Sequence, residues 1–265
     1  FPTMILLLLA CTSVSLSDNT RLNLDPFSGA VSLASPYVVG AQFDLLLDGP
    51  AAELRDYELV SRDAGVLSIG RGELSNDDDD DDDALMSFPT TAVGVGSTEV
   101  VVLGPTGEEV LQGTAEVAAP DSFELRAATD LELQENPEPV ATPVVYVGGQ
   151  SAFRVDFFFG DTPLAGAGGL GVESNNATVA TPDDSTFPDD ADWLVVEPSR
   201  AGDFSIALQS GGTAVGEVAL TAVKADSVAR VDVLRETENG AEEGDRIGVI
   251  AWAENEAGDR VYGVP

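Results

Sequence analysis

One stretch occurs twice in the chain, first as Tyr37-Val38-Val39-Gly40-Ala41-Gln42-Phe43 and again as Tyr146-Val147-Gly148-Gly149-Gln150 followed by Phe153. After each copy, apolar and polar residues alternate, which predicts a half-buried β-strand. Two further features recur later in each unit: a glycine before a closing strand, at Gly96 and Gly202, and an aspartate–serine pair, at Asp121 and Asp226. The chain is therefore expected to contain repeated β-structured units.

The spacing of these repeats predicts the domain organisation. The distances are 109, 106 and 105 residues (146 − 37, 202 − 96 and 226 − 121), close to the roughly 100 residues of an immunoglobulin-type sandwich. No window shows a helical stripe with start and stop signals. The predicted fold class is all-β, with tandem immunoglobulin-like β-sandwich domains over residues 20–120 and 121–226. We expect Trp193 to lie in a core rather than to form a sugar-binding surface.

Residues 227–265 match only the beginning of a unit, so we expect them to be the start of a third, truncated Ig-like domain. They supply about two of the roughly seven strands that a sandwich needs, and an isolated hairpin is marginal in water. We expect this segment to be loosely ordered, and the alternative is that it packs against the second unit. We also expect the natural protein to continue beyond Pro265.

Composition limits the classes of partner. The chain has 265 residues, 43% of them hydrophobic, and a formal net charge of −35 from 47 acidic and 12 basic residues. Such a surface repels nucleic acid and anionic lipid headgroups, so no nucleic-acid partner is expected. The acidity is typical of a halotolerant or extracellular surface, and a specific cationic partner is the alternative.

Side chains suited to catalysis are scarce. The sequence contains no histidine, which removes the commonest general base and metal ligand. The single cysteine, Cys11, cannot form an internal disulfide or a zinc site. Serine and cysteine hydrolase arrangements are therefore not expected. A pair of carboxylates, as in glycosidases, remains open because acidic residues are abundant.

The amino-terminal residues carry a targeting pattern. A short apolar run ends in Leu8-Leu9-Ala10-Cys11, and a polar stretch over residues 12–19 follows. The run is shorter than the ~20 apolar residues that span a bilayer. It resembles the end of a bacterial lipoprotein signal peptide, over residues 1–11, with a polar tether after it. The resemblance implies cleavage before Cys11, a diacylglycerol on its thiol and, from Thr12, transfer to the outer membrane or cell surface. An ordinary apolar strand with a buried thiol is the alternative.

Acidic loops are candidate cation sites. A homopolymeric run interrupts the first unit and consists of Asp77, Asp78, Asp79, Asp80, Asp81, Asp82 and Asp83. Like charges at this density cannot pack together, so the run is expected to be a solvated loop, with loose Ca²⁺ binding as the alternative. Further candidate Ca²⁺ ligands lie in a second acidic loop and at the unit boundaries: Asp183, Asp184, Asp189, Asp190, Asp121 and Asp226.

Two segments of the second unit carry a family resemblance. Residues 172–180 read Val-Glu-Ser-Asn-Asn-Ala-Thr-Val-Ala, and residues 201–206 read Ala-Gly-Asp-Phe-Ser-Ile. They resemble the bacterial Ig-like (BIG-type) repeats of surface proteins, which carry a serine-rich turn before a similar strand and a later Ala-Gly segment. The first unit shows weaker versions over residues 61–69 and 95–100. The resemblance implies tandem sandwiches in adhesins and surface lipoproteins, and it implies no catalytic residues.

Three functional hypotheses follow. The first is a non-enzymatic, surface-anchored lipoprotein of the bacterial envelope that acts as a spacer or as an adhesion module for a protein or glycan ligand. The second is a spacer stiffened by Ca²⁺ at its acidic loops and domain junctions, which is compatible with the first. The third is a carboxylate-based enzyme acting on glycans. No other cofactor is expected.

The aspartate run provides a first prediction. Replacing residues 77–83 by a short Gly-Ser loop should leave the melting temperature unchanged, or raise it slightly at low salt where self-repulsion is least screened. Thermal denaturation at low and high salt measures this. A fall of more than about 5 °C, equivalent to roughly 1 kcal/mol, would show that the run makes structural contacts.

Overall fold

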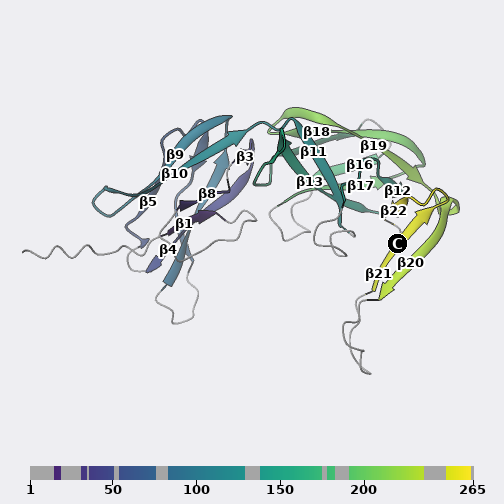
Figure 1. The fold of residues 1–265 in the computed structure, drawn as a ribbon, viewed down its shortest axis with the longest axis horizontal. Helices are drawn as coiled ribbons and strands as arrows, with labels where there is room; N and C mark the ends of the chain where they lie inside the picture. The colour runs from purple at the N-terminus through teal and green to yellow at the C-terminus, as the bar shows by residue number, and fades with distance from the viewer. Residues whose placement is uncertain are drawn as a thin grey trace, which may run out of the picture.

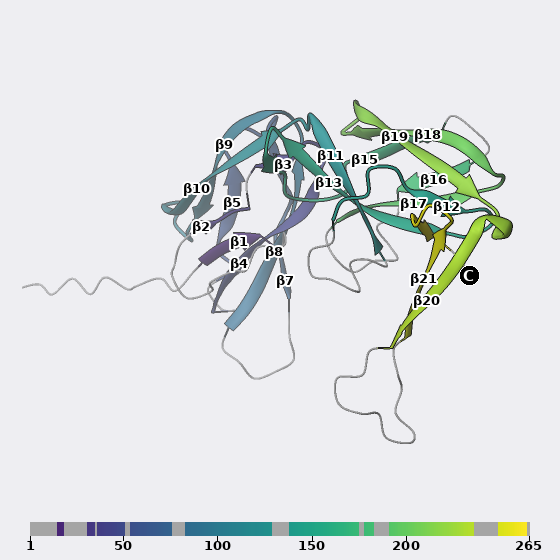
Figure 2. The same cartoon turned by 45° about the vertical axis from the view of Figure 1, so that its right-hand side comes forward.

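The computed structural model describes residues 15–18, 31–34, 36–50, 54–75, 83–128, 138–174, 178–182, 191–235 and 249–263. These residues form two β-sandwiches placed end to end, followed by a long hairpin at the far end of the second sandwich (Figures 1 and 2). Within the described residues, no helix has the length and apolarity needed to cross a bilayer. The expectation of an all-β chain of tandem sandwiches is confirmed.

The first sandwich has two sheets. One sheet contains, in order, β2 (Val31–Ser32), β1 (Ser15–Asp18), β4 (Gln42–Pro50), β8 (Asp83–Ala92) and β6 (Leu67–Ile69), and β7 (Glu73–Ser75) also pairs with β8. The other sheet contains, in order, β3 (Tyr37–Val38), β10 (Glu109–Ala118), β9 (Gly96–Leu103) and β5 (Glu58–Ser61).

The second sandwich repeats this arrangement. One sheet contains, in order, β11 (Ser122–Ala127), β13 (Ser151–Phe159), β17 (Asp192–Pro198) and β16 (Thr178–Pro182), and β14 (Thr162–Pro163) pairs with β13. The other contains, in order, β15 (Leu170–Ser174), β18 (Gly202–Ser210), β19 (Thr213–Val223) and β12 (Val144–Tyr146).

This strand order is that of an immunoglobulin sandwich. If the strands of the second unit are lettered along the chain, one sheet has the order A-B-E-D and the other C-F-G. A short A′ strand, β12, leaves the first sheet and pairs in parallel with the G strand, β19. In the first unit, β3 makes the same parallel pairing with β10. The fold assignment therefore follows from the topology of both units.

The alternation seen in the sequence produces the core. In β13, every second side chain is buried between the sheets, including Phe153, Val155 and Phe157. β18 shows the same period and contributes Ile206 and Leu208. Burying one such side chain contributes about 1.5–3 kcal/mol, so the facing apolar rows are the main source of stability. Trp193 is buried too, but it alternates along β17 with the core residues Leu194 and Val196 and lies opposite Arg154, so it is on the outer face of the sheet and not in the core between the sheets.

The structure corrects the register of the repeat by one residue. The sequence aligns Tyr37 with Tyr146, but the backbone pairing aligns Val38 with Tyr146, because each faces the last residue of its G strand. The glycines with positive φ are then Gly40 (+92°) and Gly148 (+82°). The one-residue slip arises because the first copy has one more residue between its tyrosine and this glycine (Tyr37 to Gly40) than the second copy has (Tyr146 to Gly148).

Two predicted loop boundaries also change. Residues 15–18 were expected to belong to the polar tether, but they form β1 and pair with β4. Their sequence, Ser15-Leu16-Ser17-Asp18, places one apolar residue between polar ones, a pattern that suits a β-strand. Asp83 was assigned to the solvated aspartate loop, but it is the first residue of β8 and pairs with Pro50.

The segment after the second sandwich differs from the loose segment expected from the sequence. A 3₁₀ turn, η1 (Ala225–Ser227), leads into a hairpin of β20 (Val228–Arg235) and β21 (Val249–Asn255). A short strand, β22 (Arg260–Tyr262), pairs with β21 and runs parallel to β12. The hairpin thus extends the C-F-G sheet of the second sandwich at its A′ edge, which favours the alternative of packing against that unit.

Candidate functional site

The candidate site is the junction where the first sandwich meets the second. The A′ strand and the turn after it, residues 36–42, lie against a loop of the second sandwich, residues 164–169. The Val38 amide donates to the Ala165 carbonyl at 2.9 Å, and the Ala165 amide donates to the Pro36 carbonyl at 2.9 Å. The Gln42 amide donates to the Ala167 carbonyl at 2.7 Å. Main-chain hydrogen bonds therefore join the two sandwiches as strands are joined within one sheet.

Glycine permits this close approach. A Cβ on Gly40 would lie 3.0 Å from the Gly211 Cα and 3.2 Å from the Gly169 Cα. A Cβ on Gly166 would lie 2.7 Å from the Ala41 Cβ. Since both Gly40 and Gly166 have positive φ, any side chain there would also strain the backbone. The two surfaces can meet only because these positions lack a side chain.

Buried polar groups complete the junction. Ser210 is fully buried at the end of β18, and its hydroxyl donates to the Val39 carbonyl at 3.0 Å. On the other side of the loop, the Asp192 carboxylate accepts a hydrogen bond from the Gly168 amide at 2.8 Å. Asp192 is itself buried, so it fixes the loop that the first sandwich contacts. A hydrogen bond to a buried carboxylate is among the stronger kinds in proteins.

The hydrophobic core continues through the junction. Tyr37 is fully buried and stacks on Phe43, with ring centroids 4.2 Å apart. The buried apolar residues of both sandwiches belong to one connected cluster, with Leu164 and Ala165 packed against it. The two units therefore share buried surface as well as hydrogen bonds, which is more than a flexible linker provides.

The same junction is built a second time, at the far end of the second sandwich. Val144 and Val145 of β12 pair in parallel with Val261 and Tyr262 of β22. Gly263 has a φ of +76° and occupies the place that Gly166 (+88°) has in the first junction. A Cβ on Gly149 would lie 1.8 Å from the Gly263 carbonyl oxygen. Both junctions thus combine parallel main-chain pairing with glycine at the closest contact.

An aromatic contact reinforces the second junction. The Tyr262 ring meets Phe153 edge-to-face, with centroids 5.3 Å apart. Burial raises the pKa of the Tyr262 phenol, and the nearby Arg260 guanidinium lowers it by a smaller amount. The phenol is therefore uncharged at neutral pH, as packing against a phenylalanine requires.

The two predicted Ca²⁺ ligands at the unit boundaries, Asp121 and Asp226, lie among the described residues, and Ca²⁺ binding by them stays a prediction. The Asp121 carboxylate accepts hydrogen bonds from the Gly160 amide at 3.0 and 3.1 Å and from the Ser122 hydroxyl at 3.1 Å, so it closes the turn after β13. Asp226 is exposed in η1. Among the described residues, no group of three or more Asp, Glu, His or Cys side chains could hold a metal ion.

The remaining predicted site residues lie outside the described part of the chain. These are Cys11, Asp77, Asp78, Asp79, Asp80, Asp81, Asp82, Asp183, Asp184, Asp189 and Asp190. Lipidation of Cys11 and Ca²⁺ binding by the two acidic loops therefore stay predictions.

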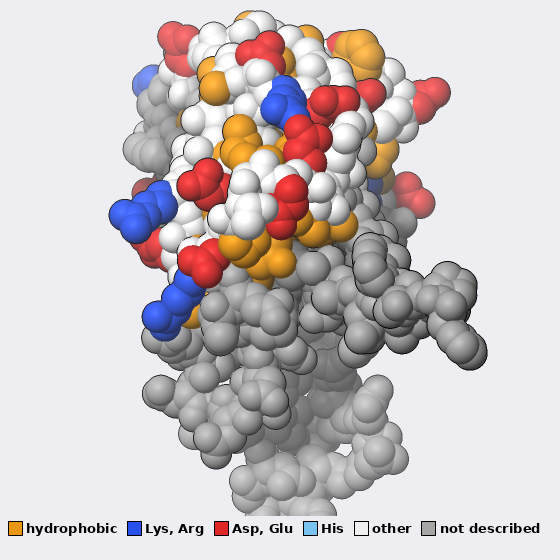
Figure 3. Space-filling model, turned by 90° about the vertical axis from the view of Figure 1, so that its left-hand side faces the viewer, with side chains coloured by type: hydrophobic (Ala, Val, Ile, Leu, Met, Phe, Trp, Pro, Cys, Tyr) orange, Lys and Arg blue, Asp and Glu red, His pale blue; other side chains and the backbone are white. Residues whose placement is uncertain are grey.

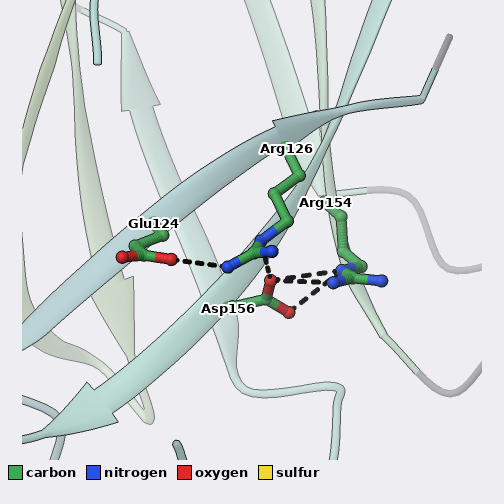
Figure 4. A network of polar contacts seen from close by, with 4 residues as sticks. All are labelled: Glu124, Arg126, Arg154 and Asp156. Carbon is green, nitrogen blue, oxygen red and sulfur yellow. Dashed lines mark hydrogen bonds and ion pairs between the residues drawn. The ribbon is translucent and has the colours of Figure 1, made fainter. Parts of the chain in front are cut away.

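A polar network on the second sandwich accounts for four charged side chains (Figure 4). Arg126 contacts Glu124 at 2.7 Å and Asp156 at 3.0 Å, and Arg154 contacts the same Asp156 at 3.0 Å. Arg126, Arg154 and Asp156 are only 14–18% exposed. The network joins β11 to β13, and each carboxylate in it is engaged by a guanidinium, so its role is structural.

In the sequence, the repeated glycines indicate only the fold and not a contact between domains. The sequence likewise does not identify Ser210 and Asp192 as part of the candidate site. The signal for the glycines was present, because the same stretch occurs twice at an element boundary. The partners of that stretch come from loops about 130 and 170 residues further along the chain (165 − 37 and 210 − 39), and no sequence pattern connects them.

The chain is similar in structure to domains of bacterial surface proteins. Domains 5–6 of the S-layer protein SbsC match at 12% identity and a TM-score of 0.28, over 78% of this chain and 99% of that one. The Escherichia coli adhesin FdeC matches at 13% identity and a TM-score of 0.32, over 96% of this chain and 76% of that one. Invasin, a bacterial integrin-binding protein, matches at 14% identity and a TM-score of 0.29, over 80% of this chain and 40% of that one. Since these TM-scores lie below 0.5, the strand order remains the basis of the fold assignment. No protein-family model and no curated protein sequence matches the chain.

The second junction gives a direct prediction. Gly149 lies outside the left-handed region, so Gly149→Ala adds no backbone strain but places a methyl group against the Gly263 carbonyl. Amide hydrogen exchange of residues 260–262 should accelerate by about tenfold or more, since overpacking of this kind costs about 1–3 kcal/mol.

The adjacent glycine supplies the control. Gly148 has positive φ, and a Cβ there meets nothing within 4 Å. Gly148→Ala should therefore strain the turn without displacing β22. Unchanged exchange in Gly149→Ala would contradict the proposed contact.

Proposed function

We propose that the chain is a non-enzymatic, lipid-anchored spacer and binding module of a bacterial cell envelope. The observation that carries the spacer role is the junction, which occurs twice with equivalent segments on each side. A unit that meets its successor through main-chain hydrogen bonds sets a defined angle, whereas a flexible linker would leave the angle free.

The connection between the sandwiches supports a fixed geometry. β10 ends at Ala118 and β11 begins at Ser122, so residues 119–121 alone join the two units. Pro120 within this connection further restricts the backbone. A short link and a shared core make the two sandwiches act as one elongated body.

The charge distribution suits a solvated position away from a surface. On the face shown in Figure 3, acidic side chains are spread over the described surface and interleaved with basic ones. A net charge of −35 repels anionic headgroups. A rod tethered at Cys11 would therefore extend from the membrane instead of lying on it.

The anchor has its own test. Two acyl chains suffice for stable membrane attachment. When the full reading frame is expressed in a bacterium with labelled palmitate, the chain should be labelled, and Cys11→Ser should not be. As a matched control, Cys11→Ser/Thr12→Cys moves the thiol by one residue and should also stay unlabelled. Equal labelling of the natural chain and Cys11→Ser would exclude the anchor.

Rigidity of the first junction tests the spacer role. Spin labels on Thr106→Cys and Glu217→Cys, in a Cys11→Ser background, report the distance between the two sandwiches. A narrow distribution is expected in the unaltered junction, and Gly40→Ala should broaden it because its Cβ meets the backbone of Gly211 and Gly169.

The equivalent glycine again provides the control. Gly148→Ala introduces the same backbone strain at a turn that faces open space, and it should leave the distribution unchanged. Circular dichroism confirms that both variants remain folded. A broad distribution before any change at Gly40 would refute a fixed spacer.

A further inference from the structure

A cleft opens along one side of the first sandwich, between the edges of its two sheets. β5 ends one sheet, and β6 and β7 both lie beside β8 at the edge of the other. The cleft has a volume of about 690 Å³, within the range of ligand sites. Apolar residues from all four strands line it: Leu59, Ile69, Leu74, Met86 and Phe88.

The cleft exists because the D strand is interrupted. β6 pairs with Thr90–Ala92 of β8 and β7 pairs with Leu85–Ser87, so residues 70–72 cross opposite Phe88 and Pro89. Gly72 passes so close that a Cβ would lie 2.7 Å from the Phe88 ring. No side chain from Gly70 or Gly72 can therefore fill the space between the sheets.

The described lining of the cleft carries more basic than acidic side chains, in contrast to the chain as a whole. Arg55 and Arg71 line it, and both are exposed. Neither makes an ion pair with a described residue, whereas Arg62 pairs with Glu109 on the same sandwich. Among the described lining residues, Glu58 is the one acidic side chain. Two guanidinium groups beside an apolar floor suit a ligand that presents carboxylates, because guanidinium binds them through paired hydrogen bonds.

The second sandwich shows that the fold does not require this feature. Its D strand, β16, pairs with β17 over residues 178–182 without interruption. Neither this strand nor β15 carries a basic residue. The interruption and the arginines therefore distinguish one repeat from the other.

The chemistry of the cleft favours a peptide over a saccharide. A saccharide stacks on exposed aromatic rings, but Tyr57 and Phe88 are only 6% and 3% exposed. In the described part of the chain, β5 pairs with β9 alone, so its outer edge faces the cleft side of the sheet. An extended peptide can add to such an edge through main-chain hydrogen bonds while its side chains enter a groove.

We propose that this cleft binds an extended acidic peptide segment of a partner protein. The peptide lies along β5, its apolar side chains face the partly buried Ile69 and Leu74, and its carboxylates meet Arg55 and Arg71. Acidic side chains that lie more than ~8 Å from the cleft oppose this binding only weakly, because charges at that distance are screened at physiological salt. This inference rests on the proposed binding role and is independent of the junction.

Fluorescence anisotropy on the full chain tests the proposal with a labelled (Val-Glu)₄ peptide. It should bind more tightly than (Val-Gln)₄ and (Val-Lys)₄. Arg55→Gln and Arg71→Gln should each weaken binding about three- to fivefold, and the double variant about tenfold or more. Arg62→Gln, whose guanidinium is already paired, serves as the matched control and should bind normally. Circular dichroism establishes that each variant is folded.

Several outcomes would overturn the proposal. Equal binding of (Val-Glu)₄ and (Val-Gln)₄, or equal losses in Arg62→Gln and Arg71→Gln, would remove the role of the arginines. Preferential binding of an oligogalacturonate would assign the cleft to a saccharide. Self-association that Arg71→Gln abolishes, without peptide binding, would assign it to a second copy of the chain. A negative result leaves the spin-label distances unaffected, so failure of the cleft is distinct from failure of the spacer.

Discussion

The structure depends on the hydrogen bonds that the A′ strand of each unit makes with the unit that follows. Within its own sandwich this strand pairs with the G strand, and its outer edge remains available. In the first unit that edge accepts Ala165, and in the second it accepts β22. An exposed sheet edge is normally a liability because it can pair with any passing strand. Here the next unit covers it, so the device that assembles the array also protects the edge.

This constraint explains the positions of glycine and of buried polar groups. A main-chain contact between two domains requires that no side chain intervene, which places glycine at Gly40, Gly149 and Gly166. It also buries carbonyl groups that must be satisfied, such as that of Val39, whose partner is the Ser210 hydroxyl. An unpaired carbonyl at this depth would cost about 1–3 kcal/mol. The junction is thus polar in its hydrogen bonds and apolar in its packing.

Much of the fold could be predicted from the sequence because it has a period. Alternation along Phe153, Val155 and Phe157 identifies a half-buried strand, and spacings near 105 residues identify the unit. The register of the repeated stretch could not be fixed, since the extra residue between Tyr37 and Gly40 allows either the tyrosines or the glycines to be aligned, but not both. The candidate site could not be predicted from the sequence for a different reason. Tyr37 and Ala165 meet only because two complete sandwiches place them side by side. Neither residue has a side chain whose chemistry would identify it in the sequence as part of an interdomain contact.

The two units also serve as controls for each other. A feature present in both, such as the A′ pairing or the positive-φ glycine after it, is required by the fold or by the array. A feature present in one copy needs a separate reason.

The broken D strand, with Gly70 and Gly72 on either side of Arg71, is such a feature. Leaving a gap between two sheets forgoes apolar contacts that would otherwise stabilise the sandwich. Two arginines lie at that gap, although the chain has a net charge of −35. They are a second difference between the two sandwiches at the same place. The coincidence of both departures is what separates the cleft from ordinary variation between repeats.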